Sequence, residues 1–216
     1  MKKLLVSSLV ATAAALLPVV VFAADGKGLA QEVWQASGGE NWGTVKTIDF
    51  TFTVVKNGKT VASATHHWNV PAQTDEVKWK GKDVTVNLAD PGTAEDAKAA
   101  YARWVNDSYW LLAPLKLKDK GVTVEAEGTK EINGAQRDVL KLSFAQVGLT
   151  PNDQYRLYVD PQSKLVTYWD YMPKGDKGMS GTWEDYKKTG GLTLATNHKM
   201  DNGVQIRFEN LKVTDK

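Results

Sequence analysis

The sequence has no cysteine among its 216 residues. This absence excludes disulfide bridges, thiol catalysis and metal sites built on thiolates. It also excludes a lipid-modified cysteine, which is a common tether of an exported protein to a membrane. Histidine is scarce as well, so imidazole chemistry is confined to His66, His67 and His198.

An excess of charge is also missing. The chain has 27 Lys and Arg against 25 Asp and Glu. Two of the basic residues, Lys2 and Lys3, lie in an N-terminal segment that we expect to be removed, and without them the two signs balance. Binding to nucleic acid needs clustered positive charge for contacts with phosphates. We therefore expect no nucleic-acid partner.

Only one long apolar run is present, and it lies at the N-terminus. Lys2 and Lys3 precede an almost wholly apolar stretch, and the segment ends at Ala23 with small or compact residues at the cleavage-site positions. This pattern is typical of a secretory signal peptide. The alternative is a membrane anchor, which Pro18 and the marginal length disfavour. We expect residues 1–23 to be cleaved and residues 24–216 to form one exported domain, periplasmic or else extracellular, with no stable membrane anchor.

Recognisable catalytic motifs are missing too. His66 and His67 are adjacent on an expected strand, so they point to opposite faces and cannot grip one metal ion together. The segment around Ser180 lacks the spacing of a nucleophile elbow. No glycine-rich phosphate loop occurs, and neighbouring carboxylates such as Glu184 and Asp185 do not converge on one substrate. We expect no enzyme activity, no cofactor and no metal.

Alternation of apolar and polar residues is the main structural signal. Ile48, Phe50, Phe52 and Val54 alternate with polar residues, which indicates a half-buried strand. The following Asn57-Gly58 pair is typical of a type I′ hairpin turn. Roughly nine to eleven strands are joined mainly by such turns, so neighbouring strands should be antiparallel and the sheet should curl.

Two segments have helical rather than strand periodicity. Leu29, Ala30, Val33 and Trp34 form one stripe before Gly38-Gly39, and an acidic first turn opens a second helix over residues 93–105. Residues 106–108 should lie in a loop at the end of that helix. The predicted fold class is therefore mainly β: a strongly curved antiparallel sheet or incomplete β-barrel with covering helices.

Large apolar side chains are plentiful, including eight tryptophans. If several of them share the concave face, they form a lining suited to an acyl chain. The alternative is that they only fill the core between sheet and helices. The candidate lining residues are Phe50, Phe52, Trp68, Trp79, Trp104, Trp110, Leu112 and Trp169.

Three segments resemble the LolA-like superfamily of periplasmic lipoprotein carriers. They are residues 158–165, which read YVDPQSKL, residues 183–196 with the central Gly190-Gly191, and residues 106–114, which read NDSYWLLAP and are similar to an uncharacterised secreted branch. The resemblance implies an unclosed β-barrel whose helix-covered concave face holds acyl chains. The carrier's lid-latching arginine on an early strand has no counterpart, because the first arginine is Arg103. The missing cysteine likewise departs from the outer-membrane acceptor, which is itself a lipoprotein.

The leading functional hypothesis is a periplasmic, non-enzymatic binding protein for a hydrophobic small molecule or an acylated ligand, with transient contact to a membrane or a lipoprotein. Two alternatives stay open. One is a packed structural or partner-binding exported domain without a cavity. The other is an exported hydrolase that uses tryptophans as stacking platforms for its substrate.

Overall fold

The structure is a computed structural model that describes residues 25–145, 148–174 and 178–215. The expected signal peptide, residues 1–23, lies outside the described residues. Two α-helices and two short 3₁₀ helices accompany twelve strands in the described part of the chain. The helices are α1 (Gly26–Ala36), η1 (Gly39–Thr44), α2 (Glu95–Leu112) and η2 (Ala113–Leu115). No helix among them is long and apolar enough to cross a membrane.

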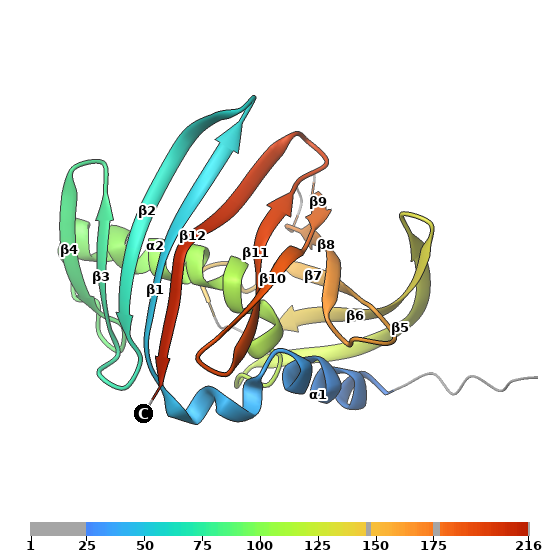
Figure 1. Cartoon of the computed structure of the whole chain (residues 1–216). Coiled ribbons are helices and arrows are strands. Elements are labelled where there is room, and N and C mark those ends of the chain that lie inside the picture. The colour runs from blue at the N-terminus through green and yellow to red at the C-terminus, as the bar shows by residue number, and fades with distance from the viewer. Residues whose placement is uncertain (1–24, 146–147, 175–177, 216) are drawn as a thin grey trace, which may run out of the picture.

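Two antiparallel sheets make up most of the molecule (Figure 1). The larger sheet has the order β10-β11-β12-β1-β2-β3-β4 and the smaller one the order β5-β6-β7-β8-β9. The strands of the larger sheet are β1 (Val45–Lys56), β2 (Lys59–Asn69), β3 (Thr74–Trp79), β4 (Lys82–Asn87), β10 (Glu184–Thr189), β11 (Leu192–Lys199) and β12 (Val204–Asp215). Those of the smaller sheet are β5 (Val122–Ile132), β6 (Ala135–Phe144), β7 (Gln154–Val159), β8 (Val166–Met172) and β9 (Met179–Thr182).

Strand alternation and turn chemistry explain the hairpins. In β1, Ile48, Phe50 and Phe52 are buried, as the alternation predicts. Beyond Phe52 the alternation changes, because a register shift in the pairing with β2 leaves Val54 half-buried and buries Val55 instead. Both residues of the Asn57-Gly58 turn have positive φ, 53° and 72°, which confirms the predicted type of hairpin.

Residues 179–189 are divided between two strands that belong to different sheets. β9 pairs with β8, whereas β10, which begins two residues later, pairs with β11. A single bridge between Gly181 and Met200 connects the two sheets at this point. No pairing joins the outer strands β4 and β5, so the described strands form a barrel that is not closed. The mainly β, incomplete-barrel fold class is confirmed, with two sheets in place of one.

The helix α2 connects the two outer strands and packs inside the curved sheets (Figure 1). It contacts β3 and β4 of the larger sheet and also β11. The sequence predicted this helix only to Val105, with residues 106–108 in a loop at its end; that boundary was wrong. The helix continues to Leu112 because Trp110, Leu111 and Leu112 supply buried apolar contacts one turn further on.

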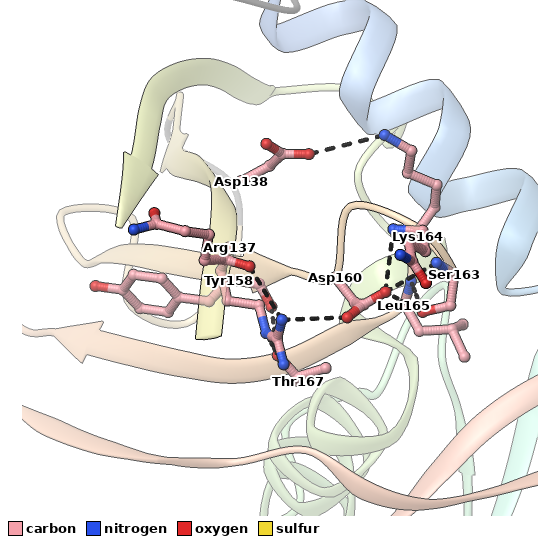
Figure 2. A network of polar contacts seen from close by, with 10 residues as sticks. Arg137, Asp138, Tyr158, Asp160, Ser163, Lys164, Leu165 and Thr167 are labelled. Carbon is pink, nitrogen blue, oxygen red and sulfur yellow. Dashed lines mark hydrogen bonds and ion pairs between the residues drawn. The ribbon is translucent and has the colours of Figure 1, made fainter. Parts of the chain in front are cut away.

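The turn between β7 and β8 ties the smaller sheet to α1. The Asp160 carboxylate accepts hydrogen bonds from the backbone N–H groups of Ser163 and Gln162 and pairs with Arg137 (Nη1 to Oδ2, 3.2 Å). These backbone donors, with the guanidinium, hold the pKa of Asp160 below its usual value. Lys164 reaches back from the same turn to Asp138 (3.7 Å) and to Glu32 of α1 (3.0 Å), and Figure 2 shows the contact with Asp138. The turn within residues 158–165 is thus held by specific hydrogen bonds and ion pairs.

Candidate cavity between α2 and the smaller sheet

A cavity of about 270 Å³ lies between α2 and the smaller sheet. Small-molecule sites usually measure about 300–1,000 Å³, so this one is slightly smaller than that range. Its walls come from α2, from strands β6 to β9 and from the segment that follows β6. The lining residues are Val105, Asn106, Tyr109, Trp110, Phe144, Gly148, Leu149, Thr150, Tyr155, Trp169, Tyr171 and Met179.

Cross-strand neighbours on β7 and β8 supply one wall. Tyr155 is directly opposite Tyr171, and Trp169 lies two residues along β8, so the period of two places all three on one face. The ring centroids of Tyr155 and Trp169 are 5.2 Å apart with planes at 17°, and those of Tyr155 and Tyr171 are also 5.2 Å apart. This contiguous aromatic surface faces the helix.

The opposite wall is one stripe of α2. Val105, Asn106, Tyr109 and Trp110 are spaced by one and four residues, which places them on one side of the helix. Trp110 packs edge-on against Trp169, with centroids 4.3 Å apart, and Tyr109 packs against Tyr155 at 5.3 Å. The two walls therefore meet through aromatic contacts.

Among the residues that the structure describes, the lining carries no charged side chain. Burial raises the pKa of Tyr109 and that of Tyr155 well above the ordinary value for tyrosine, so both phenols stay neutral. Tyr171 donates a hydrogen bond to Asp153 (2.5 Å). Burial alone would raise the pKa of this carboxyl, but hydrogen bonds, including those from Tyr171 and the Lys174 N–H, lower it. Asp153 is thus an ionised group that orients Tyr171.

The candidate lining residues fall into four groups in the structure. Trp110 and Trp169 line the cavity. Trp104 is half-buried and packs edge-on against Trp68, at 5.2 Å between centroids. Trp79 belongs to a separate small cluster between β2, β3, β4 and α2, with Ala64, Val77, Val86 and Ala100. The other candidates, which lie in the main core with Trp68, are Phe50, Phe52 and Leu112.

Several cavity residues were missed by the sequence reasoning. Tyr109, Phe144, Tyr155 and Tyr171 contribute most of the additional aromatic surface. The sequence signal for one of them was that Tyr171 shares a strand face with Trp169, since residues two apart on a strand point to the same side.

The groups considered for catalysis do not converge. Ser180 donates to Asp170 (2.7 Å), and Lys199 pairs with Glu184 (2.8 Å). The two adjacent histidines do point to opposite faces, since His66 is buried and His67 is exposed. No group of three or more potential metal ligands occurs among the residues that the structure describes.

His66 has partners that the sequence reasoning did not find. Its Nδ1 lies 2.7 Å from Asp75 of β3, and its Nε2 lies 3.2 Å from Asp107 of α2. All three side chains are buried. The sequence signal was Asp107, three residues before the apolar run of Trp110, Leu111 and Leu112, at a position that was predicted to lie in the loop after the helix.

Comparison with solved structures identifies the fold. A DUF1329 family protein from Desulfovibrio piger is 12% identical and matches with a TM-score of 0.52 over 87% of this chain and 92% of that one. A LolA superfamily protein from Nitrosomonas europaea is 8% identical, with the same TM-score and coverage of 87% and 94%. A domain described as an outer membrane lipoprotein-sorting protein from Vibrio parahaemolyticus is 12% identical, also at 0.52, with coverage of 87% and 92%.

At these identities the likeness shows the fold alone. No curated protein sequence matches the chain significantly. Residues 44–212, which span β1 to most of β12, match the family of unknown function DUF6503. The chain therefore belongs to the DUF6503 family and has a LolA-like fold.

Proposed function

We propose that this protein is a periplasmic, non-enzymatic binding protein that holds a hydrophobic ligand, a lipid or an acylated molecule, in the cavity between α2 and the smaller sheet. The observation that carries the proposal is the aromatic lining of that cavity, in which the described side chains are all uncharged. An apolar group moved from water into such a space gains about 0.8 kcal/mol per buried methylene. A segment of one acyl chain would fill it.

The mouth of the cavity supports a transient contact with a membrane or a lipoprotein. Leu149 and Met179 both line the cavity, and both are among the few large apolar side chains that are exposed in the described residues, at 54% and 37%. Exposed apolar groups at the rim of a pocket would let a ligand pass from another apolar surface with less exposure to water.

Export and the relatives also support the proposal. The first 23 residues have the pattern of a secretory signal peptide, and a chain without cysteine suits an unanchored exported protein. One of the structurally similar proteins is described as a lipoprotein-sorting domain, which is consistent with a hydrophobic cargo for this fold.

A packed partner-binding domain is the second candidate. The observation in its favour is that six of the eight candidate lining residues do not line the cavity but pack elsewhere, most of them in the main core. An exported hydrolase is less well supported, because the groups considered for catalysis are engaged in separate contacts.

The distinguishing experiment is a fluorescence titration of the purified native protein with phenylnaphthylamine, a neutral hydrophobic dye. The proposal predicts saturable binding at one site, displaced by a lipid or fatty acid. A packed domain predicts no saturable signal until the protein is unfolded. Turnover of lipid or glycan substrates by the native protein would instead favour the hydrolase.

A further inference from the structure

Four polar side chains connect α2 to the larger sheet, and we call them the α2 anchor: His66, Asp75, Arg103 and Asp107. His66 lies between two carboxylates, with Nδ1 2.7 Å from Asp75 and Nε2 3.2 Å from Asp107. Arg103, one turn before Asp107 on α2, approaches the same carboxylate at 3.5 Å. The anchor therefore joins β2, β3 and α2 inside the protein.

The geometry fixes how many protons the anchor needs. A neutral imidazole has one N–H donor, whereas both nitrogens of His66 face carboxylate oxygens. Both contacts are hydrogen bonds only if the three groups hold one proton more than a neutral imidazole and two ionised carboxylates hold. In that state, with the positive charge of Arg103, the anchor is neutral. Loss of the proton leaves a net negative charge at a site where His66, Asp75 and Asp107 are almost fully buried.

Among the groups outside the anchor, His67 has a charge interaction with Asp75 that is weaker than that of His66. The neighbours of His66 in register are Phe50 on β1 and Val77 on β3, and Phe50 stacks on the imidazole at 4.4 Å. His67 is on the opposite face of β2, where it pairs with Asp49. The charged side chains that α2 contributes to the site are Arg103 and Asp107.

The anchor is also connected to the cavity. Asn106 lines the cavity and donates from Nδ2 to Asp107 Oδ1 at 2.7 Å. The same helix supplies Val105, Tyr109 and Trp110 to the cavity wall. A change in how α2 is held at Asp107 therefore acts directly on the wall that we propose contacts the ligand.

We propose that the α2 anchor is a pH-dependent device that holds α2 over the cavity while its shared proton is bound and loosens α2 when that proton is lost. The expected change in ligand affinity rests on the proposed function. The expected loosening of α2 does not.

The direction of the effect follows from linkage. Burial lowers the pKa of His66, but hydrogen bonds and charge interactions with Asp107 and Asp75 outweigh it, so the pKa is raised above its usual 6.5. Burial likewise raises the pKa of Asp75 above 3.8. Since the held state binds the proton more tightly, the anchor is fully formed below the ordinary pKa of histidine. It weakens as the pH rises through the raised value.

The test compares His66→Gln with His67→Gln, a matched change at the next residue on the opposite, exposed face. For each protein, the affinity for phenylnaphthylamine and the amide-exchange protection of α2, corrected for intrinsic exchange, are measured between about pH 6 and about pH 9. In the wild type and in His67→Gln, both should fall with rising pH. The affinity should drop about tenfold for each unit by which the anchor's pKa differs between held and loosened α2. In His66→Gln, both should be independent of pH.

The remaining outcomes either contradict the inference or separate it from the proposed function. A wild-type α2 whose protection does not change with pH, or a His66→Gln variant that keeps the dependence, would overturn the inference. If the dye binds at no pH, the proposed function fails, and the exchange data alone decide whether the anchor responds to pH. If His66→Gln does not fold, the imidazole ¹⁵N shifts of His66 in the wild type must titrate together with α2 protection; separate transitions would contradict the proposal.

Discussion

Filling the cavity should abolish ligand binding without unfolding the protein, and Val105→Trp is the sharpest such change. Val105 lies on the α2 wall of the cavity and is only partly buried. An apolar cavity of about 150 Å³ accommodates a benzene ring. A single indole should therefore occupy much of the 270 Å³ cavity.

The expected magnitude follows from the atoms displaced. Indole adds about seven non-hydrogen atoms to the valine side chain, and each methylene-sized group that a ligand loses costs about 0.8 kcal/mol. If the new side chain displaces half that number of ligand atoms, affinity falls by about 3 kcal/mol, which is on the order of 100-fold. Valine and tryptophan have similar helix propensities, so stability should change by only about 1 kcal/mol.

The assay is the phenylnaphthylamine titration, with urea unfolding of the same variant as the check on folding. Val61→Trp is the matched control, because Val61 is 60% exposed on β2 and is not a cavity residue. It should bind the dye as the wild type does. A folded Val105→Trp protein with wild-type affinity would refute the assignment of the ligand to this cavity.

Three further predictions concern stability. Gly38→Ala should lower the free energy of unfolding in urea by about 3 kcal/mol or more, because φ is +85° and the new Cβ would lie 2.2 Å from the Gly191 carbonyl oxygen. The control Gly58→Ala, at φ +72° with nothing within 4 Å of the new Cβ, should lower it by only about 1 kcal/mol. Asp160→Ala removes the acceptor of the β7–β8 turn and the partner of Arg137, and should lower the free energy of unfolding by about 1–3 kcal/mol, whereas an unchanged midpoint would show that the turn holds without it. Burial lowers the pKa of His198 from 6.5 to about 3. Between these values the unfolded chain binds a proton at His198 that the native protein does not bind, so stability should fall as the pH drops from about 6.5 towards 3. His198→Leu should weaken that acid dependence, and the same slope in the variant would count against it.

Local signals in the sequence were sufficient to predict the strands and most of the turns. The Asn57-Gly58 turn forms as expected because both residues tolerate positive φ, and the alternation around Phe50 persists until a bulge that no local pattern shows. The end of α2 was misjudged because residues 106–108 are polar, a composition that is common in loops. Asp107 is nonetheless helical, since its carboxylate is satisfied by residues from the larger sheet and from its own helix.

The candidate site depended on contacts that a sequence does not contain. Trp110 and Trp169 line the cavity, but equally large side chains such as Phe50 and Trp68 pack in the core. Which apolar residues border open space is decided by how α2 lies on the two sheets. The α2 anchor has the same origin, because His66, Asp75 and Asp107 come from three elements and meet only in the folded chain.

The central claim is that one hydrophobic molecule occupies the cavity between α2 and the smaller sheet. The most direct measurement is organic extraction and quantitative mass spectrometry of the wild-type protein and of Val105→Trp, each purified natively from the exported fraction. A stoichiometric lipid or acylated molecule is expected from the wild type and none from the variant. An empty wild-type protein, or equal amounts of the same molecule from both, would contradict it.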